Sequence, residues 1–469
     1  MKKTKIVTSI GPASYNPDVF EQMVRAGANV ARINFSHATE EEKVKAVSTV
    51  KEVRRRTGRT IGIMYDTKGP ELRNGEMQEG GALLQEGQCI RIVKDSVVGN
   101  EKRFSLNHPD TIDNLKAGDL VLLENGLMEL EVVSREPDGA TCRITKGGTL
   151  ESKKSLSVPG VFLNIPFLSD IDRKDIIYAC RHDGDFIACS FVSSADDVRQ
   201  VRQLLAEEGR EDMRVIAKIE SQIGVANLEE IVREADGIMV ARGDLGVEAP
   251  MEDLPVYQKR IVRTCRKHNK VCIIATEMLE SMKHSSRPTR AEVTDIANAV
   301  YLGADAVMLS GETTMGEYPV EAVAYMARIC EHIENSHEYA NVFAKGKAST
   351  IAESMCYNVA ASANELRAKV IIVPTKRGVS ARLLSNLEPS CPILVLTNDQ
   401  HVERGLSLNY GVYTLLVDEM GSTDALLDQS RKVAIEWLSL TPGDIIVTCG
   451  GFHNRPSVGE SNFMTIETV

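Results

Sequence analysis

A lysine and two acidic residues in neighbouring segments have the spacing and chemistry to act on a phosphorylated substrate. Lys218 and Glu220 lie two residues apart in an apolar run, so on a strand both side chains would point to the same side. Asp244 follows the next apolar run, directly after Gly243, where backbone N–H groups could approach an anion closely. Two carboxylates from adjacent strands suit Mg²⁺, which also takes oxygens from a phosphorylated substrate. Together with the lysine they indicate phosphoryl-transfer or enolate chemistry.

Structural roles for these residues and for Arg32 stay open. Lys218 and Glu220 could form a buried ion pair that holds the fold together. The guanidinium of Arg32 could bind a phosphate through two parallel hydrogen bonds, or it could bridge to Asp66 instead.

Four short oxygen-bearing side chains form a second candidate site. Asn34 and Ser36 come at the end of one β-branched run, and Asp66 and Thr67 come at the end of the next. One carboxylate among neutral oxygens is typical of a site for a monovalent cation. The same residue types also form turns and helix caps, which leaves a purely structural interpretation open.

Eight apolar runs, each typical of a buried parallel strand, alternate with helical patterns. Their residues are 5–9, 29–33, 60–65, 185–189, 214–219, 237–240, 270–275 and 305–309. Eight such units predict a TIM (β/α)8 barrel, whose active site lies at the carboxyl ends of the strands. Polar residues follow six of the eight runs, among them Arg32, Asp66, Lys218 and Thr276. This distribution favours a catalytic mouth at that end of the barrel.

Two further domains accompany the predicted barrel, which occupies residues 1–69 and 166–337. The long stretch between the third and fourth runs contains short strand patterns separated by turn dipeptides, which predicts a small inserted β-barrel lid domain at 70–165. A lid mounted there would hang over the barrel mouth. A second α/β pattern at 338–469 predicts a C-terminal regulatory domain with an open, doubly wound sheet. The fold class is therefore α/β.

Composition excludes several kinds of function. The 55 Lys and Arg residues against 66 Asp and Glu residues give a net charge of −11, which argues against nucleic-acid binding. The sequence has no apolar run long enough for a membrane span, and because its first residues lead into a strand-like run we expect no secretory leader. The ten cysteines form no C-x-x-C pair, so a zinc site or a disulfide framework is not expected. We expect a protein of the reducing cytoplasm.

Several longer motifs resemble one enzyme family. They are NVARINFSH at 29–37, DTKGPELR at 66–73, IAKIE at 216–220, MVARGDLG at 239–246 and RPTRAE at 287–292. In this order they resemble the pyruvate kinases of the bacterial three-domain type. The resemblance implies Mg²⁺- and K⁺-dependent phosphoryl transfer from phosphoenolpyruvate to ADP, giving pyruvate and ATP in the last step of glycolysis. It also implies a homotetramer.

The resemblance implies roles for individual residues. The catalytic residues would be Lys218, Arg32 and Thr276, and the substrate would also contact Gly243 and Asp244. Mg²⁺ (or Mn²⁺) would bind Glu220 and Asp244. K⁺ would bind Asn34, Ser36, Asp66 and Thr67. The nucleotide would contact Asn34, Phe35, Ser36, His37, Arg73 and Lys154.

Some positions depart from the family's pattern, and one loop carries a regulatory hypothesis. The departures are Glu124, Asn125, Ser155 and Ser157 in the predicted lid, with Ser193 and Glu277 in the barrel. They put lid closure, the role of Lys154 and the proton relay beside Thr276 in question. In the C-terminal domain, Thr375, Lys376 and Ser380 would contact a phosphorylated effector, as a similar loop does in the family. A simple strand-to-helix turn is the alternative interpretation of this loop.

Two other functions are compatible with such a barrel. One is a metal-dependent lyase acting on pyruvate or phosphoenolpyruvate, which the predicted lid disfavours because a lyase clamps no nucleotide. The other is a non-catalytic metabolite sensor, which would need no phosphoryl-stabilising lysine such as Lys218.

Overall fold

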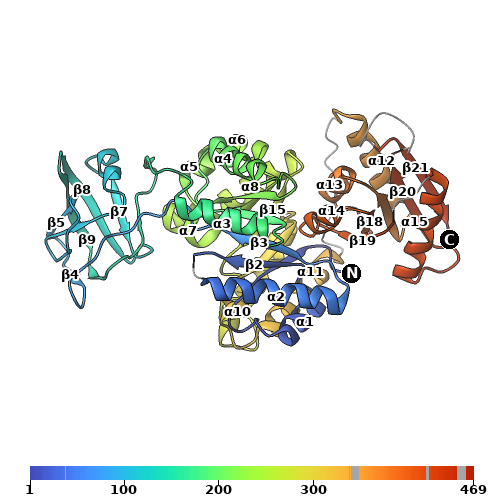
Figure 1. Ribbon diagram of the computed structural model, residues 1–469, viewed down its shortest axis with the longest axis horizontal. Helices are drawn as coiled ribbons and strands as arrows, with labels where there is room; N and C mark the ends of the chain where they lie inside the picture. Colours follow the sequence, from blue (N-terminus) through green and yellow to red (C-terminus); the bar gives the residue numbers. More distant parts are fainter. Residues whose placement is uncertain (37, 337–338, 340–347, 419–421, 452–460) are drawn as a thin grey trace.

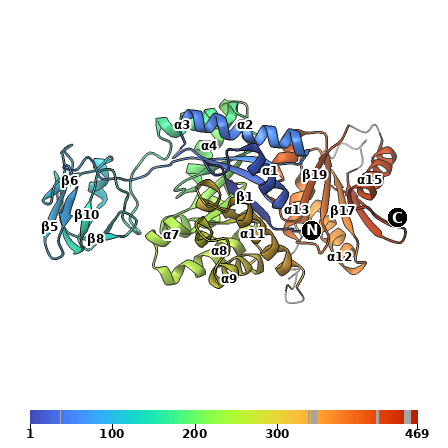
Figure 2. The ribbon, with the colours of Figure 1, turned by 90° about the horizontal axis from the view of Figure 1, so that it is seen from below.

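The computed structural model describes residues 1–36, 38–336, 339, 348–418, 422–451 and 461–469. His37, a candidate nucleotide ligand, lies outside the described residues. The chain forms three bodies in a row, with the inserted lid at one end, the barrel in the middle and the C-terminal domain at the other end (Figure 1). The same order is visible after a quarter turn (Figure 2).

The central body is a closed barrel of eight parallel strands in the order β1-β16-β15-β14-β13-β12-β3-β2, which confirms the predicted TIM barrel. Almost every strand residue is buried, because helices cover the outside and side chains fill the inside. The strands are Lys5–Ser9 (β1), Val30–Asn34 (β2), Gly62–Asp66 (β3), Phe186–Cys189 (β12), Arg214–Ile219 (β13), Gly237–Ala241 (β14), Val271–Ala275 (β15) and Ala306–Leu309 (β16).

Local sequence signals start the surrounding helices. Helices α2, α3, α4 and α9 each begin with a capping box. At the start of α2, for example, the Thr39 hydroxyl accepts a hydrogen bond from the Glu42 backbone N–H. The helices are Pro17–Ala26 (α1), Glu40–Thr57 (α2), Asp170–Arg181 (α3), Ala195–Glu207 (α4), Gln222–Ala226 (α5), Leu228–Glu234 (α6), Arg242–Glu248 (α7), Leu254–Lys267 (α8), Arg290–Tyr301 (α9), Gly311–Thr314 (α10) and Pro319–Glu334 (α11). Short 3-10 turns lie at Met251–Asp253 and Glu280–Lys283.

Aspartates tie adjacent strands together at the amino-terminal end of the barrel. One precedes each of β12, β14 and β16, and its carboxylate accepts a backbone N–H from the neighbouring strand. The pairs are Asp185 with Ile63 at 2.8 Å, Asp236 with Val215 at 3.0 Å and Asp305 with Cys272 at 2.9 Å. Strands β12 and β16 begin one residue later than predicted, although the backbones of Asp185 and Asp305 also hydrogen-bond to the neighbouring strands.

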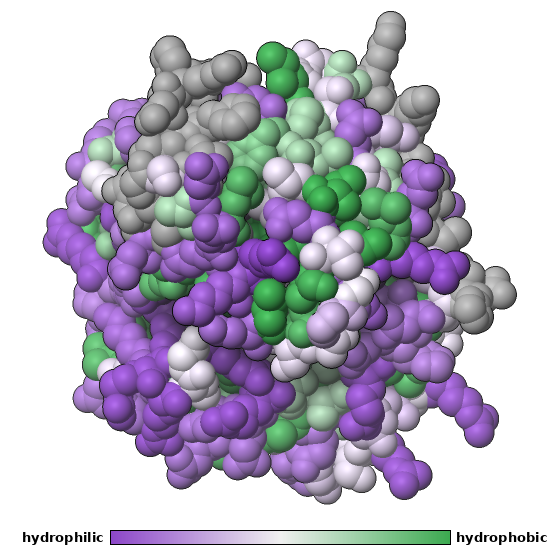
Figure 3. Space-filling model, turned by 90° about the vertical axis from the view of Figure 1, so that its right-hand side faces the viewer, coloured by the Kyte–Doolittle hydropathy of each residue, from purple (hydrophilic) through white to green (hydrophobic). Residues whose placement is uncertain are grey.

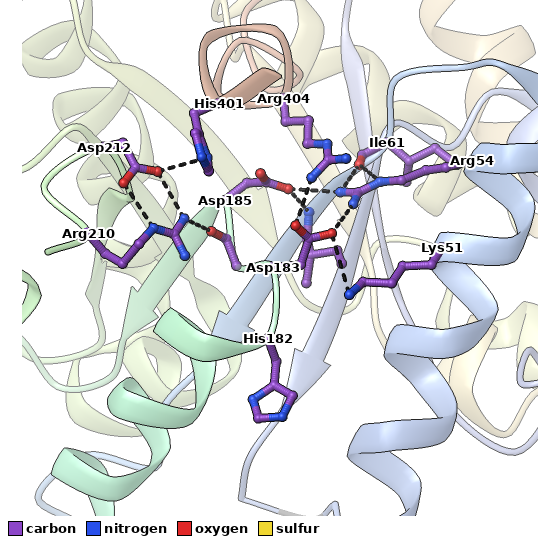
Figure 4. Close-up of polar contacts among 12 residues, drawn as sticks. Lys51, Arg54, Ile61, His182, Asp183, Asp185, Arg210, Asp212, His401 and Arg404 are labelled. Atoms are coloured by element: carbon purple, nitrogen blue, oxygen red, sulfur yellow. Dashed lines mark hydrogen bonds and ion pairs between the residues drawn. The ribbon is translucent and has the colours of Figure 1, made fainter. Parts of the chain in front are cut away.

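The C-terminal domain seals this same end of the barrel. Leu408 is fully buried within the cluster of side chains that fills the barrel interior. Around it, Asp183 accepts hydrogen bonds from Arg404 at 2.9 Å and from Arg54 at 2.8 Å, and Arg54 also reaches Asp185 at 2.9 Å (Figure 4). The Asp185 pKa is raised to about 6 because burial outweighs the attraction of Arg54. The mouth that carries the candidate site is thus at the opposite end of the barrel, at the carboxyl ends of the strands.

The inserted lid has its own hydrophobic core, between Leu72 and Val158. Its strands form a six-stranded sheet (β11-β7-β8-β9-β5-β6) and a two-stranded sheet (β10-β4). They are Ala82–Leu84 (β4), Cys89–Val93 (β5), Arg103–Ser105 (β6), Leu120–Leu123 (β7), Met128–Glu136 (β8), Gly139–Lys146 (β9), Gly148–Leu150 (β10) and Leu156–Ser157 (β11), with a 3-10 turn at Pro109–Asn114. Gly69 starts the first linker. Its φ is 71°, and a Cβ there would lie 2.8 Å from the Ser190 carbonyl oxygen, so only glycine fits.

The C-terminal domain is an open five-stranded sheet in the order β19-β18-β17-β20-β21. Its first four strands are parallel as predicted, and β21 adds an antiparallel edge that the sequence patterns did not reveal. The strands are Val370–Pro374 (β17), Ile393–Thr397 (β18), Val412–Leu416 (β19), Ile445–Gly450 (β20) and Phe463–Thr468 (β21). The helices are Ile351–Glu365 (α12), Val379–Asn386 (α13), Gln400–Gly405 (α14) and Thr423–Leu438 (α15). In the described part of the chain, no helix combines the length and apolar character needed to cross a membrane.

Candidate active site

A buried cluster of charges lies at the carboxyl ends of β13 and β3. The Lys218 ammonium is 3.1 Å from the Asp66 carboxylate, 2.9 Å from the Glu220 carboxylate and 2.6 Å from the Ser190 hydroxyl. Burial alone would lower the Lys218 pKa, but the two carboxylates outweigh burial and raise it. The ammonium therefore stays charged in the interior of the barrel mouth.

Arg32 binds the opposite oxygen of Asp66. Its Nε donates to Asp66 Oδ2 at 2.6 Å and its NH1 donates to the Ser9 hydroxyl at 2.9 Å. Burial raises the Asp66 pKa, but the charges of Arg32 and Lys218 bring it below its ordinary value. The structural bridge to Asp66 is thus present, and Arg32 still borders the open cavity described below.

The two acidic residues proposed for Mg²⁺ differ in burial and in their partners. Glu220 is buried, and its Oε2 accepts a 2.6 Å hydrogen bond from the Phe191 backbone N–H. Its Oε1 lies near Lys218 but accepts no well-aligned hydrogen bond within the described residues. Burial raises the Glu220 pKa to about 7, despite the attraction of Lys218. Asp244 is exposed and has no partner in the described part of the chain.

This donor set fits a hard divalent cation. Free carboxylate oxygens are its preferred protein ligands, and Mg²⁺ commonly takes one or two of them together with substrate oxygens and water. Across the described ranges, no group of three or more His, Cys, Asp or Glu side chains forms a ready metal centre. A cation at Glu220 and Asp244 would accordingly depend on the substrate for further ligands.

A cavity of about 1180 Å³ opens between the barrel mouth and the lid. It brings together residues predicted for substrate, metal and nucleotide. Those from the barrel are Arg32, Asn34, Ser36, Lys218, Glu220 and Asp244, and the one from the lid is Arg73. The cavity polarity and its mixed charges suit a phosphorylated, metal-bound ligand.

Two predicted nucleotide ligands lie elsewhere. The Phe35 ring is buried and stacks on Tyr65, with ring centres 5.0 Å apart, so only its backbone could meet a ligand. The Lys154 ammonium pairs within the lid with Glu124 at 2.8 Å and Glu151 at 2.9 Å. Its neighbour Lys153, which the sequence did not single out, lines the cavity.

Thr276 lies beside the loop that carries Gly243 and Asp244. The Thr276 hydroxyl accepts a 2.9 Å hydrogen bond from the Gly243 N–H and donates to the Ala275 carbonyl at 2.6 Å. Its φ is 69°, a left-handed conformation that costs energy for a β-branched residue. Arg242 holds this strained turn by donating to the Thr276 carbonyl at 2.6 Å.

The four residues predicted for K⁺ lie at adjacent strand ends. Asn34 and Asp66 face each other in the β2–β3 register, and Asn34 accepts a 3.1 Å hydrogen bond from the Ser36 N–H. The Thr67 hydroxyl accepts one from the Ser190 N–H at 3.3 Å. Both oxygens of Asp66 already contact cationic side chains, so a monovalent cation would share this carboxylate with them.

Three functional contacts were missed by the sequence reasoning. Ser190 and Phe191 hold Lys218 and Glu220, and Ser9 holds Arg32. Ser9 ends the first predicted run and Ser190 follows the fourth, so the strand-end rule applied to all eight runs would have found both. No spacing signal marks Phe191, which acts through its backbone.

The proposed effector loop forms a hydrogen-bonded turn. The Thr375 hydroxyl accepts a 3.0 Å hydrogen bond from the Gly378 N–H, which is typical of a strand-to-helix turn. The Ser380 hydroxyl is buried and lies 2.5 Å from the Ser461 hydroxyl. Lys376 is exposed. Residues 452–460, next to Ser461 in sequence, lie outside the described part.

The barrel, its charged mouth and the opposing inserted domain define a protein of the (β/α)8 class with a polar cavity at the usual place of the active site. The pyruvate kinase barrel-domain family matches residues 1–323, and the pyruvate kinase alpha/beta-domain family matches residues 353–467. The chain belongs to the pyruvate kinase family, and it is a phosphotransferase of that type, a kinase of glycolysis.

Individual relatives agree over the whole chain. A pyruvate kinase of Geobacillus stearothermophilus is 41% identical over all of this chain and 80% of its own length. One of Clostridium perfringens is 35% identical over the full length of both proteins. A crystal structure of a pyruvate kinase from Cryptosporidium parvum superposes with a TM-score of 0.94 at 35% identity, covering 100% of this chain and 96% of the other. The family is generally metal dependent, and neither the lyase nor the sensor hypothesis is favoured.

Proposed function

We propose that this chain transfers the phosphoryl group of phosphoenolpyruvate to ADP, giving pyruvate and ATP, at the mouth between barrel and lid. The observation that carries the assignment of residues is the cluster of Lys218, Arg32 and Glu220 on one wall of the cavity, with Asp244 beside it. Phosphoryl transfer needs positioning and charge neutralisation more than covalent chemistry, and this cluster supplies both.

Each residue of the cluster has a distinct task. Lys218 stabilises the negative charge on the migrating phosphoryl group and on the enolate oxygen left behind, because its ammonium stays charged when buried. Arg32 holds the phosphoryl group from the side of β2. The Gly243–Asp244 loop receives the substrate carboxylate. Mg²⁺ (or Mn²⁺), held by Glu220 and Asp244, supplies charge neutralisation when bound.

Thr276 acts on the proton side of the reaction. Its hydroxyl is held between the Gly243 N–H and the Ala275 carbonyl, so its position beside the substrate loop is fixed. We assign it to the face where the enolate of pyruvate is protonated, through a water molecule. The exposed carboxylate of Glu277 is next in sequence.

Coupled turnover tests the reaction itself. The protein should form pyruvate from phosphoenolpyruvate only when ADP and a divalent cation are both present, with ATP in equal amount. Pyruvate formed without ADP would instead support the lyase or a phosphatase, and binding without turnover would support the sensor.

Asn34→Ala should weaken K⁺ activation. Asn34 contributes an oxygen at the proposed K⁺ site but contacts neither Lys218 nor Arg32, unlike Asp66. We expect the K⁺ concentration for half activation to rise about tenfold or more, as loss of a supporting ligand usually does. The measurement is initial rate against K⁺, with wild-type protein in Na⁺ as the reference. An unchanged K⁺ response would refute the assignment.

Lys154→Met should raise the KM for ADP while leaving the KM for phosphoenolpyruvate nearly unchanged. In the structure the Lys154 ammonium pairs with Glu124 and Glu151, and lid closure would exchange these partners for nucleotide phosphates. Loss of one charge-assisted contact predicts a change of about tenfold. Lys153→Met is the matched control. If Lys153→Met raises the KM and Lys154→Met does not, the nucleotide lysine is Lys153.

Regulation, assembly and location complete the proposal. A phosphorylated effector would meet Thr375, Lys376 and Ser380 in the C-terminal domain.

A homotetramer would need apolar surface, and the outer face of the C-terminal domain shows hydrophobic patches among hydrophilic ones (Figure 3). The exposed large hydrophobic residues of this domain include Ile351, Leu366, Leu416 and Ile466. The cytoplasm is the location we propose.

A further inference from the structure

A second cavity, of about 470 Å³, lies at the hinge of the lid. Its wall comes from the lid around β7 and β11, from both linkers between lid and barrel, and from barrel residues at the start of α4 and around α5 and α7. The linker that follows β11, as far as Phe167, supplies most of the apolar surface, and the Phe162 side chain in it is 62% exposed. A volume of this size is typical of sites for small organic molecules.

The charge of this cavity has one sign. Five carboxylates line it and no Lys, Arg or His side chain does. Three of them have evident partners or roles: Glu71 pairs with Arg73, Asp197 accepts the backbone N–H groups that start α4, and Asp244 belongs to the catalytic mouth. Asp196 is an exposed rim residue that lies 3.8 Å from Arg199 and accepts a hydrogen bond from Gln200 at 3.2 Å, so Glu248 remains.

Glu248 is the unusual group in this wall. Within the described residues its carboxylate forms no ion pair, and burial raises its pKa to about 7. The neighbouring hydroxyl of Ser157 hydrogen-bonds to this carboxylate and partly offsets the effect of burial, whereas the charge of Asp244 adds to it. A carboxylate in mostly apolar surroundings without a cation is costly, and a ligand that brings a positive charge would remove that cost.

We propose that the hinge cavity binds a small organic monocation, whose ammonium pairs with Glu248 and whose apolar body packs on the linker around Phe162. Charge complementarity selects the occupant. An anion would be repelled by the surrounding carboxylates, a metal ion would leave the apolar wall bare, and a neutral apolar molecule would leave Glu248 unpaired.

Occupancy would affect the lid. A ligand in this cavity touches the lid, its linker and the barrel at once, so it favours the lid arrangement seen here over a closed one. This step rests on the proposed function, in which the lid closes during turnover: a cation that keeps the lid open inhibits phosphoryl transfer. Because Asp244 borders both cavities, the cation lowers kcat and also raises the KM for phosphoenolpyruvate.

Calorimetry on the full chain without substrates tests the binding. The probes are protonated 2-naphthylmethylamine and its neutral counterpart 2-naphthalenemethanol. We expect the amine to bind at least about tenfold more tightly, as a charge-assisted contact does. Glu248→Gln should erase this preference, whereas Asp196→Asn, at the exposed rim, should change it by less than about twofold.

A second variant, which fills the cavity, keeps the proposal testable if Glu248→Gln fails to fold. Ile223→Trp places a large ring in the cavity wall and should abolish binding of both probes. Equal affinity for amine and alcohol, retention of the preference in Glu248→Gln, or no binding up to millimolar amine would each overturn the proposal. Because binding is measured without turnover, it stands or fails separately from the proposed reaction.

Discussion

Lys218→Met lowers kcat by about 10³-fold or more, while the KM for phosphoenolpyruvate changes little. Methionine keeps most of the length of the side chain but removes the ammonium that lies between Asp66, Glu220 and Ser190. That charge is needed most when negative charge develops on the migrating phosphoryl group and the enolate, so its loss falls on the transition state.

Steady-state kinetics with circular dichroism of the variant measures this effect. Lys43→Met is a matched control, because Lys43 is also buried and lies 3.0 Å from the Asp175 carboxylate, but outside the catalytic cavity. Lys43→Met should lower stability with little change in kcat. A Lys218→Met enzyme with unchanged kcat would remove Lys218 from the mechanism.

Glu220→Gln should lower kcat by about 10²-fold or more and raise the Mg²⁺ concentration for half activation. The amide keeps an oxygen that can accept from the Phe191 N–H, but it is a weaker ligand than a carboxylate. Only Asp244 would remain as a carboxylate ligand. The variant also takes one negative charge away from Lys218.

A Mg²⁺ titration of the initial rate separates the two effects. Glu312→Gln is the control, since Glu312 is an equally buried carboxylate at the end of β16 that accepts hydrogen bonds from the Leu279 and Ser310 N–H groups. It does not line the cavity. If Glu312→Gln shifts the Mg²⁺ requirement as far as Glu220→Gln does, the assignment of Glu220 as a ligand is wrong.

The barrel was predictable from sequence because its strands are buried on both faces. Runs such as 214–219 are mostly apolar or β-branched for that reason, apart from Arg214 and Lys218, and the structure has β13 at the same residues. Prediction was wrong by one residue at the starts of β12 and β16, where Asp185 and Asp305 bond to the neighbouring strands through both backbone and side chain. It also failed at β21, an edge strand that lacks the apolar run of a buried one.

The candidate site was predictable only where one element sets the geometry. The period of a strand places Lys218 and Glu220 on the same side, and the structure has them 2.9 Å apart. Contacts between elements left no such signal: the Phe191 backbone reaches Glu220, and Lys154 pairs inside the lid while Lys153 faces the cavity. Those placements depend on how distant segments pack, which residue spacing does not encode.

The left-handed turn at Thr276 and Glu277 bears on how this enzyme could be engineered. Glu277 is exposed with a φ of 54°, so glycine there would relieve roughly 1 kcal/mol of backbone strain. The same change would loosen the turn that keeps the Thr276 hydroxyl on the Gly243 N–H. Selection of variants for melting temperature alone would therefore enrich enzymes with higher stability and lower kcat. A mutant library made for stabilisation should leave Thr276 and Glu277 unchanged.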